Sequence, residues 1–496
     1  MAEADFDLIV IGSGPGGYVG AVRAAQLGMK TAIVERSLLG GVCLNWGCIP
    51  TKSLLANAEI YEKAAHETEQ WGLIFEKLDF DWPKIVGRSR AVAERLNKGV
   101  AFLMRKNKIE HFKAHAKIIK GSTGDGLCRV DLHDAEVKDS DTRIPVTISD
   151  KVTRTLTAKN ILIATGAVAR ELPFAPLDGE RIIGAREAMT LEKVPESLAV
   201  IGAGAIGMEF AYVYHTYGCK VTVVEMMDRI LPVEDDDISA GLLKIFKRAG
   251  MKIHTGTTVK EISKTEKGVS IKIENKGKTE NIEAEKVLVA VGVKGRFDGL
   301  FDDSLGIETY KEHIKVNYRG VESPDYATSV PGIFAIGDVI GPPWLAHVAS
   351  EEAIIAVERM AGHDPIPIDY DCVPGCTYCQ PQVASVGFTE RALKEKGMNK
   401  GEDYEVGIYN LQAHGKAIAA GANRGLVKII RDKGQGTILG AHILGEQATE
   451  LIGEMGLAKR LEMTTGEMIL TIHAHPTMHE ALHEAALAAE GRVIHG

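Results

Sequence analysis

The clearest pattern of apolar and polar positions in the chain is a short apolar run followed by a helical repeat. Residues 7–11 form such a run, and the helical pattern after them continues to about Leu27 and stops at Gly28. A second apolar run, residues 31–34, follows. Short apolar runs bounded by glycine are typical of buried strands. This part of the chain therefore predicts a strand, a helix and a second strand.

The same unit returns later in the chain. An apolar run, a helical pattern and a second apolar run occupy residues 198–224, and a glycine again separates the helical pattern from the second run. In both copies a glutamate follows 23 positions after the first glycine of the turn, from Gly12 to Glu35 and from Gly202 to Glu225. The repeat predicts two βαβ units of parallel sheet.

Each copy has glycines at G-x-G-x-x-G spacing between its first strand and its helix. They are Gly12, Gly14 and Gly17 in the first copy and Gly202, Gly204 and Gly207 in the second. This spacing allows a tight turn and a close approach of the backbone to a pyrophosphate, whose charge the helix N-terminus stabilises. A glycine triplet alone also suits an ordinary turn. Placed between a strand and a helix, and followed by an acid, it predicts a dinucleotide site in each copy.

The glutamate at the end of each copy helps to choose the nucleotide. A carboxylate at Glu225 accepts hydrogen bonds from a ribose 2′-hydroxyl and repels a 2′-phosphate. Residues 226–228 contain no Arg or Lys. The second site is therefore predicted to prefer NAD to NADP.

Other segments carry weaker patterns. Residues 81–108 have the repeat of a long amphipathic helix, and residues 112–158 alternate apolar and polar positions between glycines, as in a small antiparallel meander. Residues 161–166 and 287–292 predict further buried strands. Another apolar run ends at Asp338, a position that also suits a turn or a helix cap.

Composition places the chain among α/β proteins with several domains. It has 496 residues, of which 45% are hydrophobic, 25% are charged and 53 are glycine. The net charge of −9 argues against nucleic acid as a partner, and no long apolar run predicts a membrane span. The acidic first residues do not resemble a secretory signal, so a cytoplasmic location is expected. Seven cysteines, an odd number, do not suit a disulfide framework there.

Two of the cysteines, Cys43 and Cys48, stand out by their surroundings. Five positions of helix separate Cα atoms by about 7.5 Å, whereas a disulfide needs roughly 4.4–6.8 Å, so a bond between them requires a bent backbone. Three glycines can supply the bend: Gly40, Gly41 and Gly47. Pro50 suits the first position of a following helix, whose N-terminus favours a thiolate. The pattern predicts a redox-active dithiol, and two ordinary thiols are the alternative.

The character of the chain changes beyond about residue 363, where strands become shorter and a helical stretch covers residues 448–459. After it, Pro476 suits a helix start, which would leave His475 projecting just outside the helix with Glu480 close by. A histidine with a carboxylate is the pair that general acid–base catalysis near neutral pH requires. A surface or capping histidine is the alternative.

Taken together and in this order, the motifs resemble the disulfide-containing flavoprotein oxidoreductases, and among them the dihydrolipoamide dehydrogenases. The resemblance covers essentially the whole chain. It implies an α/β fold with two Rossmann-like domains, for FAD and NAD, and a C-terminal α+β dimerisation domain. The expected divisions are residues 1–168 (FAD, first part), 169–291 (NAD), 292–362 (FAD and central, second part) and 363–496 (dimerisation). Glutathione-type and mercuric reductases fit less well, because the chain has Glu225 and no C-terminal cysteine pair.

The resemblance also implies the site residues. FAD would lie on Gly12, Gly14, Gly17, Glu35 and Asp338, NAD on Gly202, Gly204, Gly207 and Glu225, with further cofactor contacts at Lys52, Thr165, Gly166 and Gly292. Lys52 would pair with Glu209 beside the flavin. His475, oriented by Glu480, would act as the base from the other subunit of a homodimer.

The activity implied is oxidation of dihydrolipoyl groups through a Cys43–Cys48 disulfide and FAD, with reduction of NAD. The partners implied are lipoyl-bearing carriers of 2-oxo acid dehydrogenase or glycine cleavage complexes. Two enzyme alternatives are a flavin reductase of another disulfide and a quinone or diaphorase-type oxidoreductase. A flavoprotein without dithiol exchange, serving as a structural subunit, is the alternative outside enzymes.

The chain departs from the family pattern at three places. Residues 167–170 lack the usual proline, and residues 293–296 replace the common Arg-Arg-Pro-Asn. The third departure is a group of cysteines, Cys372, Cys376 and Cys379. Three ligands are too few for a structural zinc site, which takes four. Thiols are therefore expected there and no metal site, with a metal or a regulatory disulfide as alternatives.

Overall fold

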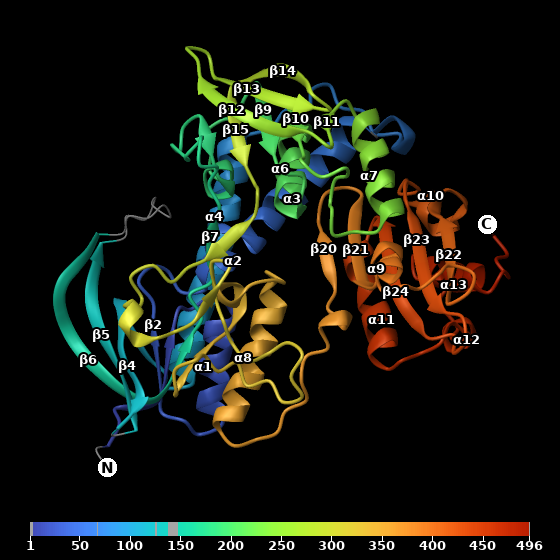
Figure 1. Ribbon diagram of the computed structural model, residues 1–496. Helices are drawn as coiled ribbons and strands as arrows, with labels where there is room; N and C mark the ends of the chain where they lie inside the picture. Colours follow the sequence, from blue (N-terminus) through green and yellow to red (C-terminus); the bar gives the residue numbers. More distant parts are fainter. Residues whose placement is uncertain (1–2, 67, 125, 137–146, 496) are drawn as a thin grey trace. The chain divides into compact units, whose positions relative to one another are not determined.

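Residues 3–66, 68–124, 126–136 and 147–495 are described by a computed structural model. The chain divides into two units, each assembled from three segments (Figure 1). The first contains Met1–Ser53, Lys84–Arg170 and Gly292–Ile368, and the second contains Leu54–Pro83, Glu171–Val291 and Asp369–Gly496.

The first unit is built on a sheet with the order β3-β2-β1-β6-β5-β4, and β19 pairs with β6. Its parallel strands are β1 (Phe6–Ile11), β2 (Thr31–Val34), β3 (Glu110–Phe112), β6 (Thr147–Ile163) and β19 (Ile333–Ala335). The helices α1 (Pro15–Gln26) and α8 (Ala346–Met360) lie side by side (Figure 1). The strand, helix and strand predicted from residues 7–34 are confirmed.

The predicted meander is confirmed in the described residues. The strand predicted over residues 161–166 is not a separate strand, because it is continuous with the last strand of the meander. The strands β4 (His115–Thr123), β5 (Leu127–Glu136) and β6 pair antiparallel, and residues 137–146 between β5 and β6 lie outside the description. The strand expected over residues 161–166 is the end of β6, which stops at Ile163. No glycine or proline interrupts residues 158–160, so the strand continues from the meander into the parallel sheet.

Two departures from the family pattern lie opposite each other in the first unit. The strands β7 (Ala167–Ala169) and β16 (Val293–Gly295) form an antiparallel ribbon, in which Val293 faces Ala169 and Gly295 faces Ala167. The Gly295 N–H points away from this ribbon and donates to the Glu312 carbonyl at 3.0 Å, a bond that a proline at residue 295 would remove.

The second unit contains the second βαβ copy. Its parallel sheet has the order β11-β10-β9-β15-β8. The strands are β8 (Ile182–Ile183), β9 (Ser197–Ile201), β10 (Lys220–Val224), β11 (Lys252–His254) and β15 (Lys286–Val289). The helices with them are α5 (Ala185–Ala188), α6 (Ala205–Thr216) and α7 (Asp236–Arg248). A three-stranded antiparallel sheet adds β12 (Thr258–Lys264), β13 (Val269–Asn275) and β14 (Lys278–Ala284).

The C-terminal part of the second unit is an antiparallel sheet with the order β20-β21-β24-β23-β22. Its strands are β20 (Gly375–Thr377), β21 (Gln382–Gly387), β22 (Tyr404–Asn410), β23 (Leu426–Asp432) and β24 (Ile438–Gly445). The helices α9 (Glu390–Glu395), α10 (Gly415–Ala419), α11 (Ala448–Arg460), α12 (Thr465–Leu470) and α13 (Glu480–Ala489) complete it. The helix expected over residues 448–459 is confirmed as α11.

Two longer helices, α3 (Cys48–His66) and α4 (Trp82–Lys106), contain residues of both units. The amphipathic helix predicted over residues 81–108 is confirmed as α4. Among the described helices, none is both long and apolar enough to cross a membrane.

Candidate functional site

The first glycine of each glycine-rich turn is required by its backbone. Gly12 has a φ of 96° and Gly202 a φ of 99°, values that side chains rarely permit. A Cβ would lie 2.4 Å from the Ala164 carbonyl oxygen at Gly12, and 2.4 Å from that of Ala290 at Gly202. Each strand can therefore turn sharply into its helix only with glycine at this position.

The other two glycines of each turn differ in their surroundings: the third glycine is closely packed, and the second faces open space. A Cβ at Gly17 or Gly207 would lie 2.0 Å from the carbonyl oxygen of the first glycine of its turn. At Gly14 and Gly204 a Cβ would meet no atom of the described residues within 4 Å. The space at each helix N-terminus therefore remains accessible to a ligand, and the exposed N–H groups there suit a pyrophosphate.

The two predicted ribose carboxylates are held against these turns. Glu35 Oε2 accepts from the Ser13 N–H at 3.0 Å and from the Ser13 hydroxyl at 2.8 Å. Glu225 Oε2 accepts from the Ala203 N–H at 2.6 Å, and its Oε1 accepts from the Met227 N–H at 2.7 Å. An ionised carboxylate has about four acceptor sites. Both groups are therefore fixed in position and can still accept from ribose hydroxyls.

Two polar groups of the first unit fit a bound cofactor. The Thr165 hydroxyl is buried beside the Gly12 turn and has no hydrogen-bond partner among the described residues. Asp338 lies in a short 3₁₀ turn, Gly337–Ile340, where burial raises its pKa to about 6. Buried polar groups are normally hydrogen-bonded. These two groups fit the expected flavin contacts, and the turn proposed as the alternative for Asp338 is also present.

Gly166 and Gly292 both lie where the first unit's chain passes to or from the second. The Arg296 N–H donates to the Gly166 carbonyl at 2.9 Å, and the Arg170 N–H donates to that of Gly292 at 2.9 Å. Both glycines have positive φ, 71° and 102°. Their structural role is therefore to close the ends of the β7–β16 ribbon.

The two cysteines of the predicted dithiol lie on consecutive helices. Cys43 belongs to α2 (Gly41–Trp46) and Cys48 begins α3, with the helical path broken at Gly47. The bend expected from the glycines is confirmed, and it brings the thiols into hydrogen-bond contact. The expectation that Pro50 begins the helix is wrong by two residues, because the Thr51 N–H already bonds the Gly47 carbonyl at 3.1 Å. Pro50 remains in the first turn, where it needs no N–H partner.

The surroundings of the two sulfurs differentiate them. The hydrogen bond from the Cys43 thiol lowers the pKa of Cys48, and Lys52 and the Cys48 backbone N–H add to this effect, so that together they outweigh burial. The pKa of Cys43 is raised, first by its hydrogen bond to Cys48 and then by burial. Of the two sulfurs, Cys48 is therefore the one whose surroundings favour the thiolate.

The predicted histidine and carboxylate form a pair. His475 Nδ1 lies 2.8 Å from Glu480 Oε1, and the imidazole side chain is 80% exposed. Because a carboxylate only accepts, Nδ1 carries the proton and Nε2 is left as the basic nitrogen. Burial acts to raise the pKa of Glu480, but the hydrogen bonds from the Thr477 N–H and from His475 lower it below its usual value. The carboxylate stays ionised.

The helix expected to begin at Pro476 begins instead at Glu480. The Thr477 hydroxyl donates to the Ala474 carbonyl at 2.7 Å, and the Thr477 N–H donates to Glu480 Oε2 at 2.8 Å. These local bonds hold the segment in a turn and compete with a helix. The prediction was wrong in the position of the helix and right in leaving the imidazole exposed.

Lys52 and Glu209 belong to different units. Lys52 follows Cys48 by one turn of α3, while Glu209 is buried on α6, where its Oε1 accepts from the Tyr378 N–H at 3.0 Å. Their pairing stays a prediction.

Comparison with known proteins identifies the chain. Residues 6–353 match the family model of pyridine nucleotide-disulphide oxidoreductases, and residues 373–486 match that family's dimerisation domain. The chain belongs to this family. It is therefore an oxidoreductase with FAD and NAD as cofactors, and the open glycine turns and the Thr165 hydroxyl fit them.

Similar members of the pyridine nucleotide-disulphide oxidoreductase family align with nearly the whole chain. A dihydrolipoyl dehydrogenase of Rhizobium etli is 46% identical over 497 residues, covering 100% of each chain. One of Chlorobaculum tepidum is 44% identical over 98% of this chain and 97% of its own. A crystal structure of LpdA from Mycobacterium tuberculosis, 25% identical, has a TM-score of 0.83 over 97% of this chain and 98% of that one.

Several residues around the family's cysteine motif were missed from the sequence. The Asn45 amide donates to the Leu39 and Gly41 carbonyls at 2.8 and 2.9 Å, and so fixes α2. Arg90 donates to the Asn45 carbonyl at 2.7 Å and lies 4.5 Å over the Trp46 ring. Asn45 and Trp46 stand inside the motif and could have been noticed, but Arg90 comes from α4 and carries no local signal.

A second acid near His475, the predicted base, was also missed. Glu454 on α11 contacts His473 Nε2 through Oε1 at 2.8 Å and His479 Nδ1 through Oε2 at 2.6 Å. These two histidines flank the turn that carries His475. Two histidines facing one glutamate 19 and 25 residues away are not a pattern that helical spacing predicts.

The remaining cysteine group does not gather around one point. Cys372 Sγ donates to Asp369 Oδ2 at 2.9 Å, Cys379 Sγ donates to the Pro381 carbonyl at 3.5 Å, and Cys376 contacts the Tyr378 hydroxyl. None of the three forms a disulfide with another described residue. Their assignment as plain thiols stays a prediction.

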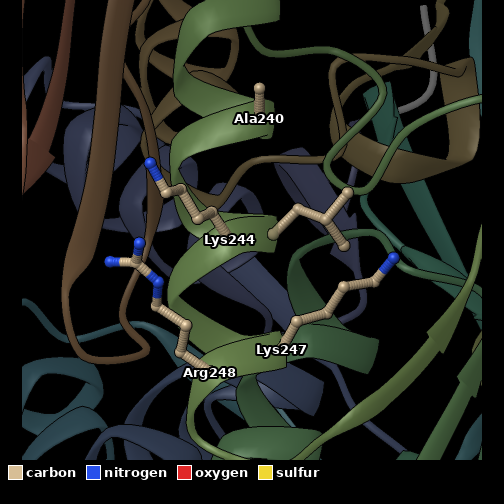
Figure 2. A pocket seen from close by; sticks show the side chains of 5 residues that line it. Ala240, Lys244, Lys247 and Arg248 are labelled. Carbon is tan, nitrogen blue, oxygen red and sulfur yellow. The ribbon is translucent and has the colours of Figure 1, made fainter.

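A hollow of about 460 Å³ lies over the outer face of α7 (Figure 2). It is lined by Ala240, Leu243, Lys244, Lys247 and Arg248. It contains none of the predicted site residues.

Proposed function

We propose that the protein is a dihydrolipoyl dehydrogenase that transfers two electrons from a dihydrolipoyl group to NAD. The single observation that carries this proposal is the pair of contacting cysteines on α2 and at the start of α3, in which the pKa of Cys48 is lowered and that of Cys43 is raised. The full-length relatives named dihydrolipoyl dehydrogenase support the choice of substrate.

The reaction begins with the cysteine pair as a disulfide. His475 Nε2 takes a proton from the first substrate thiol, and the substrate thiolate attacks Cys43 Sγ. A mixed disulfide forms, the Cys43–Cys48 bond breaks, and Cys48 leaves as the thiolate that its surroundings favour. The second substrate thiol then attacks the substrate sulfur bound to Cys43 and closes the substrate's disulfide, while its proton passes to the departing Cys43 sulfur. Cys43 is released as a thiol, Cys48 remains the thiolate, and His475 keeps the first proton.

The cofactors would be held by the groups already described. Gly14, Glu35, Thr165 and Asp338 would hold FAD, and Gly204 and Glu225 would hold NAD. When bound, the flavin supplies the two-electron relay between the dithiol and nicotinamide that no side chain provides.

The assembly and location are parts of the same proposal. A homodimer is supported by the match of residues 373–486 to a dimerisation domain. The three proposed boundaries, after residues 168, 291 and 362, lie near the segment ends at residues 170, 291 and 368, but the two units also break after residues 53 and 83. Lipoyl-bearing carrier proteins are the proposed partners. A cytoplasmic location is supported by the odd number of cysteines.

The direct test is formation of NADH by the purified holoenzyme. With dihydrolipoamide and NAD we expect NADH to form much faster than with reduced glutathione and NAD. We also expect it to form much faster than the protein oxidises NADH when a quinone is the electron acceptor. Absorbance at the NADH band measures all three. Faster turnover of another disulfide or of the quinone would replace this function by one of the enzyme alternatives.

The Glu225→Gln variant tests the choice of nucleotide. The amide keeps the size of the side chain but removes the charge that repels a 2′-phosphate, so the preference for NAD over NADP should fall about tenfold. The kcat/KM values for the two nucleotides measure it. The same change at the exposed Glu308 of the other unit is the control and should leave the ratio unchanged. An unaltered ratio in Glu225→Gln would remove this residue from nucleotide selection.

A further inference from the structure

A lysine with no exposed surface lies in the C-terminal sheet and is surrounded by acids. Lys428 Nζ on β23 donates to Asp235 Oδ1 and Asp237 Oδ2, both at 2.6 Å, and to Glu390 Oε2 at 2.7 Å. The three carboxylates could otherwise hold a metal ion. Here the ammonium group occupies that point, and its pKa is raised because the carboxylates outweigh burial. We call these four residues the lysine cage.

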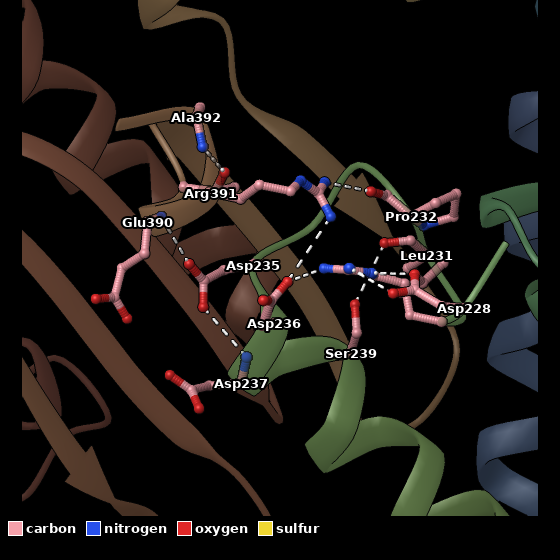
Figure 3. A network of polar contacts seen from close by, with 12 residues as sticks. Asp228, Leu231, Pro232, Asp235, Asp236, Asp237, Ser239, Glu390, Arg391 and Ala392 are labelled. Carbon is pink, nitrogen blue, oxygen red and sulfur yellow. Dashed lines mark hydrogen bonds and ion pairs between the residues drawn. The ribbon is translucent and has the colours of Figure 1, made fainter. Parts of the chain in front are cut away.

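The lysine cage joins two parts of the second unit that are distant in sequence. Asp235 is the N-cap of α7, where its Oδ1 accepts from the Asp237 N–H at 3.2 Å. Its Oδ2 accepts from the Glu390 N–H of α9 at 3.0 Å. The adjacent Arg391 donates to the Pro232 carbonyl at 2.7 Å (Figure 3). The start of α7 and the segment before it are therefore fastened to the C-terminal sheet.

The segment before α7, residues 226–234, leads back to the NAD turn, and we call it the nucleotide loop. Leu231 is its central contact. The Leu231 N–H donates to the Ala203 carbonyl at 2.7 Å, and the Leu231 carbonyl accepts from the Glu234 N–H at 2.9 Å and from the Ser239 hydroxyl at 3.3 Å. A chain of hydrogen bonds thus runs from the cage to the middle residue of Gly-Ala-Gly.

Ala203 is held from both sides, by Glu225 just before the nucleotide loop and by Leu231 within it. Its N–H donates to the Glu225 carboxylate and its carbonyl accepts from Leu231. Leu231 has a φ of 44°, in the left-handed region that a leucine rarely adopts. Such strain persists only where surrounding contacts impose it, and it is concentrated at functional sites.

We propose that Lys428 is a positioning residue for NAD, because the lysine cage fixes the nucleotide loop and, through Leu231 and Ala203, the turn that receives the pyrophosphate. The inference rests on the proposed function in taking NAD as the ligand of this turn. Removing the ammonium leaves Asp235, Asp237 and Glu390 within a few ångströms of each other without a cation. Their repulsion then acts on the start of α7 and releases the loop.

The test measures the binding of NADH by fluorescence titration of the FAD-loaded protein. In Lys428→Met we expect the Kd for NADH and the KM for NAD to rise about tenfold, the effect of losing one well-formed charged contact. The FAD content and the KM for dihydrolipoamide should stay unchanged. Lys315→Met removes an exposed lysine that pairs with Glu308 at 2.7 Å, and it should change none of these values.

A second variant keeps the test decisive if Lys428→Met does not fold. Asp237 is 46% exposed, and Asp237→Asn removes one arm of the cage without leaving a buried charge unpaired. It should raise the Kd for NADH by a smaller factor. A lowered melting temperature with an unchanged Kd in this variant would overturn the inference, because the cage would then only stabilise the fold. A wild-type protein that binds NADH but does not oxidise dihydrolipoamide would overturn the proposed function alone.

Discussion

Replacing Cys48 by serine is expected to lower kcat for dihydrolipoamide oxidation by about 10³-fold or more, because Cys43 and Cys48 act together as one disulfide and neither can accept the electrons alone. Serine preserves the size of the side chain, so the contact with Cys43 remains. It cannot form a disulfide, and its hydroxyl does not ionise near neutral pH. NADH formation under saturating substrate measures the loss.

The matched control is Cys372→Ser. The Cys372 thiol donates to the Asp369 carboxylate, and a serine hydroxyl can do the same, so this variant should keep wild-type turnover. The FAD content of both variants should equal that of the wild type. Appreciable turnover by Cys48→Ser with bound FAD would disprove the assignment of the dithiol.

Replacing His475 by glutamine is expected to lower kcat/KM for dihydrolipoamide by about 10²–10⁴-fold, the usual contribution of a general base. Glu480→Gln should cause a smaller loss of the same kind. Its pKa is lowered in the folded protein, so the carboxylate orients His475 above that pKa and the orientation is lost as the pH falls through it. The pH profile of kcat/KM in both variants distinguishes this role from a structural one.

The control for this prediction is close in the sequence. His479 also contacts a carboxylate, Glu454, at 2.6 Å, and is 47% exposed. His479→Gln should keep most of the activity. Because the base of each site is proposed to come from the partner subunit, co-expressed Cys48→Ser and His475→Gln chains should regain activity that neither has alone. Failure to regain it would place the base in the same chain as its cysteines.

Local sequence predicted those parts of the fold whose contacts are local. The two βαβ copies were found because a glycine turn, a helix and an acid follow each other within 23 residues, and the structure repeats even the 2.4 Å and 2.0 Å approaches that exclude a Cβ. The end of β6 was misjudged because a glycine at residue 166 was taken to end a separate strand. The start of α13 was misjudged because Pro476 can begin a helix only if the next residues are free to enter it. Thr477 instead bonds Ala474 and Glu480, and these bonds hold the segment in a turn.

The parts of the site that could not be predicted depend on partners distant in the chain. Arg90 supports the cysteine motif from α4, and Glu454 holds two histidines from α11. Lys428 meets Asp235 across 193 positions. No periodicity or motif around a charged residue in a strand, such as Lys428, predicts which residues it will contact. Only the folded chain shows that the ammonium group is buried among three acids.

The order of residues in the lysine cage has a consequence for biosynthesis. All three acids precede Lys428 in the sequence, so a ribosome makes the anions of the cage before their cation. Until translation has passed residue 428, the nascent chain holds the glycine turn near Gly202 without the group that neutralises those acids. If the cage positions the turn as proposed, the final ordering of this nucleotide pocket is expected late in synthesis, although its fingerprint is translated in the first half of the chain.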